Sequence, residues 1–273
     1  MGAFYGALAA LSIGLADLFS RHIVLRRGPN VAAMMVQAVA TVVSFAMVFV
    51  IASEFGWRDV AIGAVSGAGL ALGLAAYLGG LARSSSAVVA PIVATLSAVI
   101  PFGYAVARGA PSTAWAVTGA VIAVAGLVLV TAGGEPMANV GAGVRWSVAS
   151  GLGYGFGLSV VIEASEASGA WPAVGQRAAA MLLMVFVVFR SQGRVHMIGV
   201  RMLGVAAGTV AALSTVFYLL GVQADPTPAV ITASMFPAVT VAVGRIVFGD
   251  AVSRLQLLGL GVVLVGVTAV VAA

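Results

Sequence analysis

The sequence contains no cysteine, no lysine and only eight acidic residues among 273. Without cysteine there can be no disulfide framework, no thiolate nucleophile and no cysteine-based metal site. All 13 basic residues are arginines, and they are scattered near the ends of apolar segments, so they form no basic face for nucleic acid. Charged residues make up 8% of the chain, whereas a soluble domain carries about a quarter. This scarcity of charge excludes an ordinary water-soluble domain.

Long apolar runs fill most of the chain instead. Hydrophobic residues make up 62% of it, and the mean hydropathy is +1.16. The runs are about 20 residues long, the length that crosses a bilayer core, and they do not alternate as barrel strands do. We therefore predict an all-α integral membrane protein with ten transmembrane helices, at residues 3–25, 30–52, 60–81, 87–107, 112–132, 144–166, 172–189, 202–222, 228–248 and 254–273.

The second half of the sequence repeats the first at a nearly constant shift. Matching residues lie 140 to 143 positions apart; the pairs are Gly14 and Gly155, Pro29 and Pro172, Tyr77 and Tyr218, Gly119 and Gly259, and Gly126 and Gly266. We interpret residues 1–135 and 142–273 as two copies of a five-helix unit. Because five is odd, the second copy must enter the membrane inverted, as in transporters built from inverted repeats.

The arginines predict an orientation in the membrane. Ten of the 13 lie near the connections that follow the odd-numbered helices, and three (Arg58, Arg108 and Arg177) lie on the other side. Positive residues favour the cytoplasmic side. We therefore expect a multi-pass protein of the cell membrane with both termini outside the cytoplasm.

The segment FPAVTVAVGRIVFGDAVSRLQLLGLGVVLVGV, which begins at Phe236, resembles the EamA repeat of the drug/metabolite transporter superfamily. In that repeat a helix proline precedes a Gly-acid pair, and a glycine-spaced final helix follows. Pro237, Gly249 and Asp250 take the first three of these positions, and Gly259 and Gly266 lie in the final helix. The first copy departs from the pattern, with Ser97 in place of the proline and Ala110 in place of the acid. The resemblance implies transport of small metabolites or drugs, usually export, through a cavity between the halves.

Asp17 lies within the first predicted span, where a charge is costly and is a candidate for function. Arg21 lies four residues further on, on the same helix face, and is positioned to neutralise it. Two interpretations stay open: a structural ion pair, or a role in coupling or substrate binding.

Polar residues inside other spans are candidates for the wall of a substrate cavity. Tyr77 and Tyr218 each end a stripe of small or polar residues at helical spacing, which is equally typical of a helix packing seam. Tyr154 lies between two glycines, and Gln37 lies in the middle of the second span. Arg177 lies five residues inside the seventh span; it either extends to the lipid headgroups or binds a carboxylate or phosphate.

Prolines are expected to bend two of the helices or to expose their carbonyls. Each removes one backbone donor from its helix. They are Pro91 and Pro101 in the fourth span and Pro237 in the ninth.

These features predict a secondary transporter that moves small organic metabolites, such as amino acids, through a central cavity between the two copies. Its partners would be the substrate, the lipid bilayer and either protons or a counter-substrate. The alternatives are a channel or non-transporting membrane partner, and an intramembrane enzyme. Enzymatic activity is not expected, because the only histidines, His22 and His196, lie near predicted helix ends and in no motif. No cofactor or metal is expected.

Overall fold

The computed structural model describes residues 1–81, 86–110, 112–131, 140–192, 199–236, 238–239, 242, 246 and 253–271. Every regular element in these residues is helical. The helices are α1 (Gly2–Arg27), α2 (Pro29–Met47), α3 (Trp57–Leu81), α4 (Ser86–Ala107), α5 (Ala114–Thr131), α6 (Val140–Val160), the 3₁₀ turns η1 (Val161–Glu163) and η2 (Glu166–Ser168), α7 (Trp171–Gln192), α8 (Arg201–Ala224), α9 (Pro226–Ala233) and α11 (Arg254–Val271).

Most of these helices begin and end within a few residues of the predicted spans, and local chemistry explains the breaks. Gly28 ends α1 with a φ of 85°, a conformation that glycine adopts without the strain of a side chain. Pro29 then opens α2, where its missing N–H costs nothing because the first amides of a helix have no partner within it.

Three predicted spans are corrected. The helix predicted at 30–52 ends at Met47, after which the amides of Val48, Phe49 and Val50 donate to carbonyls only three residues earlier. The helix predicted at 144–166 ends at Val160, because Ala164 is extended and the chain continues through η1 and η2. The helix predicted at 228–248 is interrupted: α9 ends at Ala233, and the Ser234 hydroxyl donates to the carbonyl of Val230 at 2.7 Å.

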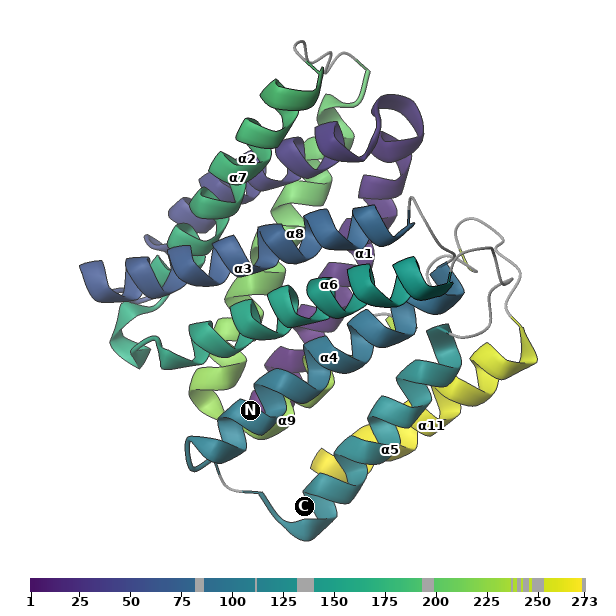
Figure 1. The fold of residues 1–273 in the computed structure, drawn as a ribbon. Helices are drawn as coiled ribbons and strands as arrows, with labels where there is room; N and C mark the ends of the chain where they lie inside the picture. The colour runs from purple at the N-terminus through teal and green to yellow at the C-terminus, as the bar shows by residue number, and fades with distance from the viewer. Residues whose placement is uncertain are drawn as a thin grey trace.

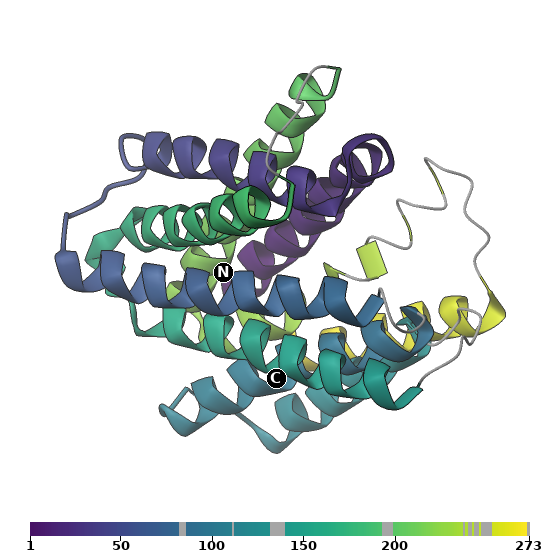
Figure 2. The same cartoon turned by 45° about the horizontal axis from the view of Figure 1, so that its top comes forward.

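Eight helices pack as a closed ring. Each packs against the next in the order α1, α8, α2, α7, α3, α6, α4, α9, and α9 returns to α1. In Figure 1, α3, α6 and α4 lie side by side in front of α1 and α8, and Figure 2 shows the same arrangement turned by 45°. Helices α5 and α11 pack together beside α4 and α9, outside this ring.

Small residues allow the ring helices to approach closely. A side-chain carbon added to Gly153 of α6 would lie 2.8 Å from the backbone of Gly73 in α3, too close for any side chain. Ser66 of α3 donates to the carbonyl of Gly157 at 2.6 Å and accepts from Gln176 of α7 at 2.7 Å. The stripe before Tyr77 is therefore, in part, the packing seam that the sequence indicated.

The outer surface and the helix lengths fit a membrane. Among the residues that the structure describes, five helices are long and apolar enough to cross it: α1, α2, α3, α7 and α8. Large apolar side chains face outward, such as Phe4, Phe186 and Met202, the last of which is 81% exposed. Apolar surface of this extent needs lipid or another protein to cover it. The described chain is an all-helical protein embedded in a membrane.

Candidate functional site

Most of the polar residues selected from the sequence face the interior of the ring. Successive helical residues are rotated by about 100°, so a residue nine positions from an outward-facing one lies on the opposite side. Arg177 is nine positions from the exposed Phe186 in α7, and Ala211 is nine positions from the exposed Met202 in α8. By the same geometry Tyr154 faces away from the exposed Leu152 of α6.

Asp17 of α1, Tyr77 of α3 and Tyr154 of α6 form the first interior group. The Asp17 carboxylate interacts electrostatically with both tyrosines, and the tyrosines interact with each other. Asp17 is exposed although it lies far inside α1. Among the described residues α1 packs mainly on α8, α9 and α2, while α3 and α6 lie across the ring. The exposed carboxylate therefore faces the space between α1 and the pair α3 and α6. Arg21 is exposed one turn further along α1.

Arg177 and Gln37 form the second interior group, together with the inner face of α8. Nη1 of Arg177 donates to Oε1 of Gln37 at 3.1 Å. Nη2 donates to the carbonyl of Ala211 and to the hydroxyls of Ser214 and Thr215. Arg177 is therefore held inside the ring between α7, α2 and α8, and it does not extend to the headgroups. Gln37 and Arg177 lie 140 positions apart, the spacing of the sequence repeat.

Tyr218 closes one end of the interior. Its hydroxyl donates to the carbonyl of Leu158 at 3.2 Å, which joins α8 to α6 across the ring. Tyr218 also belongs to a hydrophobic cluster with members from α1, α8, α9 and the segment after α6, against which residues of α3, α4 and α6 pack. This connector-end cluster consists of Ala9, Val161, Ala164, Tyr218, Leu219, Val222, Ala229, Val230 and Ala233. It fills the end of the ring at which residues 161–170 connect α6 to α7, called here the connector end.

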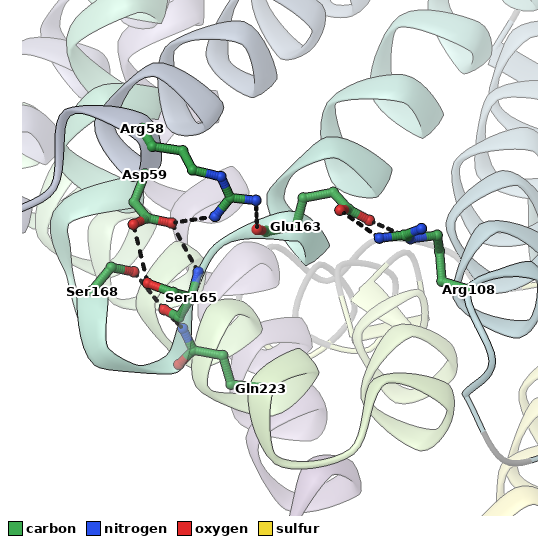
Figure 3. Close-up of polar contacts among 7 residues, drawn as sticks. All are labelled: Arg58, Asp59, Arg108, Glu163, Ser165, Ser168 and Gln223. Carbon is green, nitrogen blue, oxygen red and sulfur yellow. Dashed lines mark hydrogen bonds and ion pairs between the residues drawn. The ribbon is translucent and has the colours of Figure 1, made fainter.

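A polar network covers the connector end (Figure 3). Asp59, in the first turn of α3, accepts hydrogen bonds from the amide and the hydroxyl of Ser165 at 2.8 and 3.0 Å. Gln223 of α8 donates to the carbonyl of Ser165 at 3.0 Å. Arg58 pairs with Asp59 at 3.5 Å and donates to the carbonyl of Glu163. The connection between α6 and α7 is thus fixed to α3 and to α8.

Glu163 extends this network to the end of α4. Its carboxylate accepts from Nε and Nη2 of Arg108 at 2.8 and 3.0 Å and from the Tyr104 hydroxyl at 2.8 Å. The Tyr104 hydrogen bond and then those from Arg108 lower the pKa of Glu163 below its ordinary value. A cavity of about 380 Å³ opens beside the pair, lined by Ala105, Arg108, Gly109, Ala110, Ile162, Glu163 and Pro226.

Sequence reasoning missed this network. Asp59, Arg108 and Glu163 counted only as charges near helix ends, because partners such as Arg108 and Glu163 are 55 positions apart and form no local pattern. The available signal was the concentration of acids with the few arginines on one predicted side of the membrane.

The structure describes the positions of two of the three predicted helix prolines. Helix α4 runs through both Pro91 and Pro101, and Pro101 is fully buried. Pro237 lies outside the described residues, as does Asp250. Within the described part of the chain, no three acidic or histidine side chains gather as a metal site.

A solved structure described as "Crystal structure of protein" is similar to this fold, with a TM-score of 0.79. The similarity covers 98% of this chain and 95% of that chain, at 16% sequence identity. At this identity the similarity shows a shared fold. No protein-family model and no curated protein matches the chain.

Proposed function

We propose that this protein is a secondary transporter of the drug/metabolite transporter superfamily that exports small organic metabolites, such as amino acids, by alternating access. One observation carries the proposal: a ring of eight helices directs Asp17, Tyr77, Tyr154 and Arg177 toward its interior in a chain that otherwise has very few charges. Polar groups held inside a membrane mark substrate and ion pathways, because their burial is costly without such a role.

The packing of the helices supports the duplication of the chain. The main packing pairs turn into one another when each helix of the first half is exchanged with its counterpart in the second half. The exchanged helices are α1 and α6, α2 and α7, α3 and α8, α4 and α9, and α5 and α11. For example, α1 on α8 becomes α6 on α3, while α2 on α7 and α5 on α11 are unchanged. In the last pair Gly126 meets the carbonyl of Gly259, and Gly266 meets that of Gly119. Such reciprocal contacts are expected between two copies related by a two-fold axis.

The difference between the two ends of the ring supports alternating access. The connector-end cluster and the network around Asp59 and Glu163 close one end. The exposure of Asp17 inside the ring supports an interior that opens toward the other end, where α1 is joined to α2 at Gly28. With the orientation predicted by the arginines, the open end faces the cytoplasm, as an exporter needs in order to load its substrate.

Counterflow in proteoliposomes tests this function. Vesicles with the purified protein are loaded with one unlabelled metabolite at a time, and uptake of the same labelled compound is followed against protein-free vesicles. Counterflow needs no energy source, so it tests transport whichever gradient drives it. We expect at least one amino acid or related metabolite to accumulate transiently. Lack of flux across a broad panel contradicts transport, and equal flux into loaded and unloaded vesicles indicates a channel.

A second series tests the coupling role of Asp17. Uptake is measured with and without a pH gradient in the wild type and in Asp17→Asn. We expect the pH gradient to accelerate uptake only in the wild type, because the asparagine side chain cannot bind and release a proton as a carboxylate does. Full gradient-driven uptake by Asp17→Asn would remove Asp17 from coupling while leaving the transport function intact.

A further inference from the structure

Arg177 is an interior cation held by neutral groups only. Among the described residues its hydrogen-bond acceptors are the Gln37 side-chain amide oxygen, the Ala211 carbonyl and the hydroxyls of Ser214 and Thr215. None of these carries a charge. Burying a guanidinium without an anionic partner is expensive, because neutral dipoles replace only part of its hydration. The site therefore holds a positive charge that its own walls do not neutralise.

The guanidinium also has a donor left over. The N–H of Nε is buried and has no hydrogen-bond partner within the described part of the chain. An arginine side chain offers five N–H donors in a rigid planar fork, and a carboxylate accepts two of them in parallel. A carboxylate that bound Nε–H and Nη2–H would satisfy the orphan donor and replace the hydroxyls of Ser214 and Thr215, which are free to rotate to other acceptors.

The position of Arg177 determines from where such an anion could come. The side chain faces away from the outer surface marked by Phe186 and toward the inner face of α8. Tyr218, about one turn from Ser214 on that inner face, is bonded to Leu158 in the sealed connector end. An anion bound at Arg177 would therefore lie inside the ring, next to the seal, and would reach it through the interior.

We propose that Arg177 binds the carboxylate of the transported molecule, so that the substrates are small carboxylic acids such as amino acids or 2-oxo acids. This inference rests on the proposed transport function and makes it more specific. Gln37 positions the guanidinium from α2, and Ser214 and Thr215 hold it when no substrate is bound. The carboxylate supplies the negative charge that the site lacks.

The test compares acids with their amides. A panel of amino acids and 2-oxo acids, each with its matched primary amide, is measured in two ways: the shift in melting temperature of the detergent-solubilised protein, and counterflow. The proteins are the wild type, Arg177→Gln, Arg177→Lys and the control Arg190→Gln, which changes an exposed arginine of the same helix. The melting temperature without ligand shows whether each variant is folded.

We expect at least one acid to raise the melting temperature of the wild type and of Arg190→Gln. Its amide should need an at least about tenfold higher concentration for the same shift. Arg177→Gln should lose this preference. Arg177→Lys should keep part of it, because an ammonium retains the charge without the fork. If Arg177→Gln does not fold, the preference for acids over amides is compared between the wild type and Arg177→Lys, and a smaller preference in Arg177→Lys supports the site.

Two results would overturn the inference. One is equal action of acids and amides on the wild type, or no stabilisation by any acid. The other is an undiminished preference for acids in Arg177→Gln. Failure of the transport function gives a different result: acids stabilise the wild type in an Arg177-dependent way, but no compound shows counterflow. If amides are transported at the same rate as acids, the transport function is supported, but Arg177 is not a carboxylate-binding site.

Discussion

Tyr77 and Tyr218 lie 141 positions apart at matching places in the sequence repeat, yet their surroundings differ. Tyr218 is only 6% exposed, donates to the carbonyl of Leu158 and packs in the connector-end cluster. Tyr77 is half-buried and faces the charge of Asp17. Asp17 and Leu158 are also 141 positions apart. The same tyrosine therefore belongs to a dry seal in one half and to a polar wall in the other.

In the proposed transporter, this difference would let one repeated unit serve two purposes. Two inverted copies in the same conformation would leave both ends of the interior alike. Alternating access requires one end to be closed while the other is open, so the copies must differ at any moment. In the proposed transporter, the difference between Asp17 and Leu158 would be a permanent part of this asymmetry, because a carboxylate is costly in a dry cluster and tolerable where water reaches it.

Replacing Asp17 by leucine should have the largest effect, because it makes the polar wall resemble the seal. Counterflow should fall clearly below the wild-type rate, because leucine removes the charge that faces Tyr77 and Tyr154 inside the ring. Leu11→Met, an outward-facing change on the same helix, is the control. Wild-type counterflow by Asp17→Leu would contradict the role of Asp17 in the wall.

The reverse change, Leu158→Asp, places a carboxylate against the connector-end cluster. We expect a loss of at least about 2.5 kcal/mol in stability, the minimum for an acid at the membrane centre. Thermal unfolding in detergent measures the loss, with the volume-conserving Leu158→Met as its control. If Leu158→Asp and Leu158→Met have the same melting temperature as the wild type, the cluster does not seal this end.

Removing the two hydroxyls should distinguish the tyrosines more finely. Tyr218→Phe leaves the Leu158 carbonyl without this donor and should cost about 1 kcal/mol of stability. Tyr77→Phe should leave stability nearly unchanged and should instead alter the rate of counterflow. Equal melting temperatures for the two variants would show that the tyrosines are not specialised.

The smallest effect is expected from Glu163→Gln, and it depends on pH. Because its partners lower the pKa of Glu163 in the folded protein, the ion pair contributes to stability above the ordinary carboxyl pKa of about 4.5. That contribution is lost as the pH falls through the lowered, folded-state value. At pH 7 the wild type should have a higher melting temperature than Glu163→Gln, and this difference in melting temperature should decrease as the pH falls. A gap that is constant with pH, or equal to that of the exposed Glu166→Gln, would count against the pair.

The helices could be predicted from the sequence because apolar runs of about 20 residues, ended by glycine, proline or arginine, leave few alternatives. The errors occurred where tertiary contacts decide the backbone. Helix α6 ends early because Glu163 and Ser165 take part in the connector-end network, and α9 ends at Ala233, where the Ser234 hydroxyl donates to the carbonyl of Val230.

The candidate residues were predictable one at a time, but their groupings were not. Gln37 and Arg177 were each unusual in an apolar span, and the structure joins them in one hydrogen bond. Asp17 was considered only together with Arg21 on its own helix, and the structure adds electrostatic interactions with Tyr77 and Tyr154 on two other helices. Such pairings depend on how distant helices meet, and nothing in a single segment encodes that.

The absence of cysteine from the chain permits the most direct test of alternating access. Arg108→Cys and Glu163→Cys are introduced together, and a bifunctional methanethiosulfonate joins the thiols between the neighbouring ends of α4 and α6 at the connector end, with each single cysteine as control. The account predicts that counterflow falls to the level of protein-free vesicles when the cross-link forms and returns after reduction. Full counterflow with the cross-link intact would contradict the opening of this end during transport.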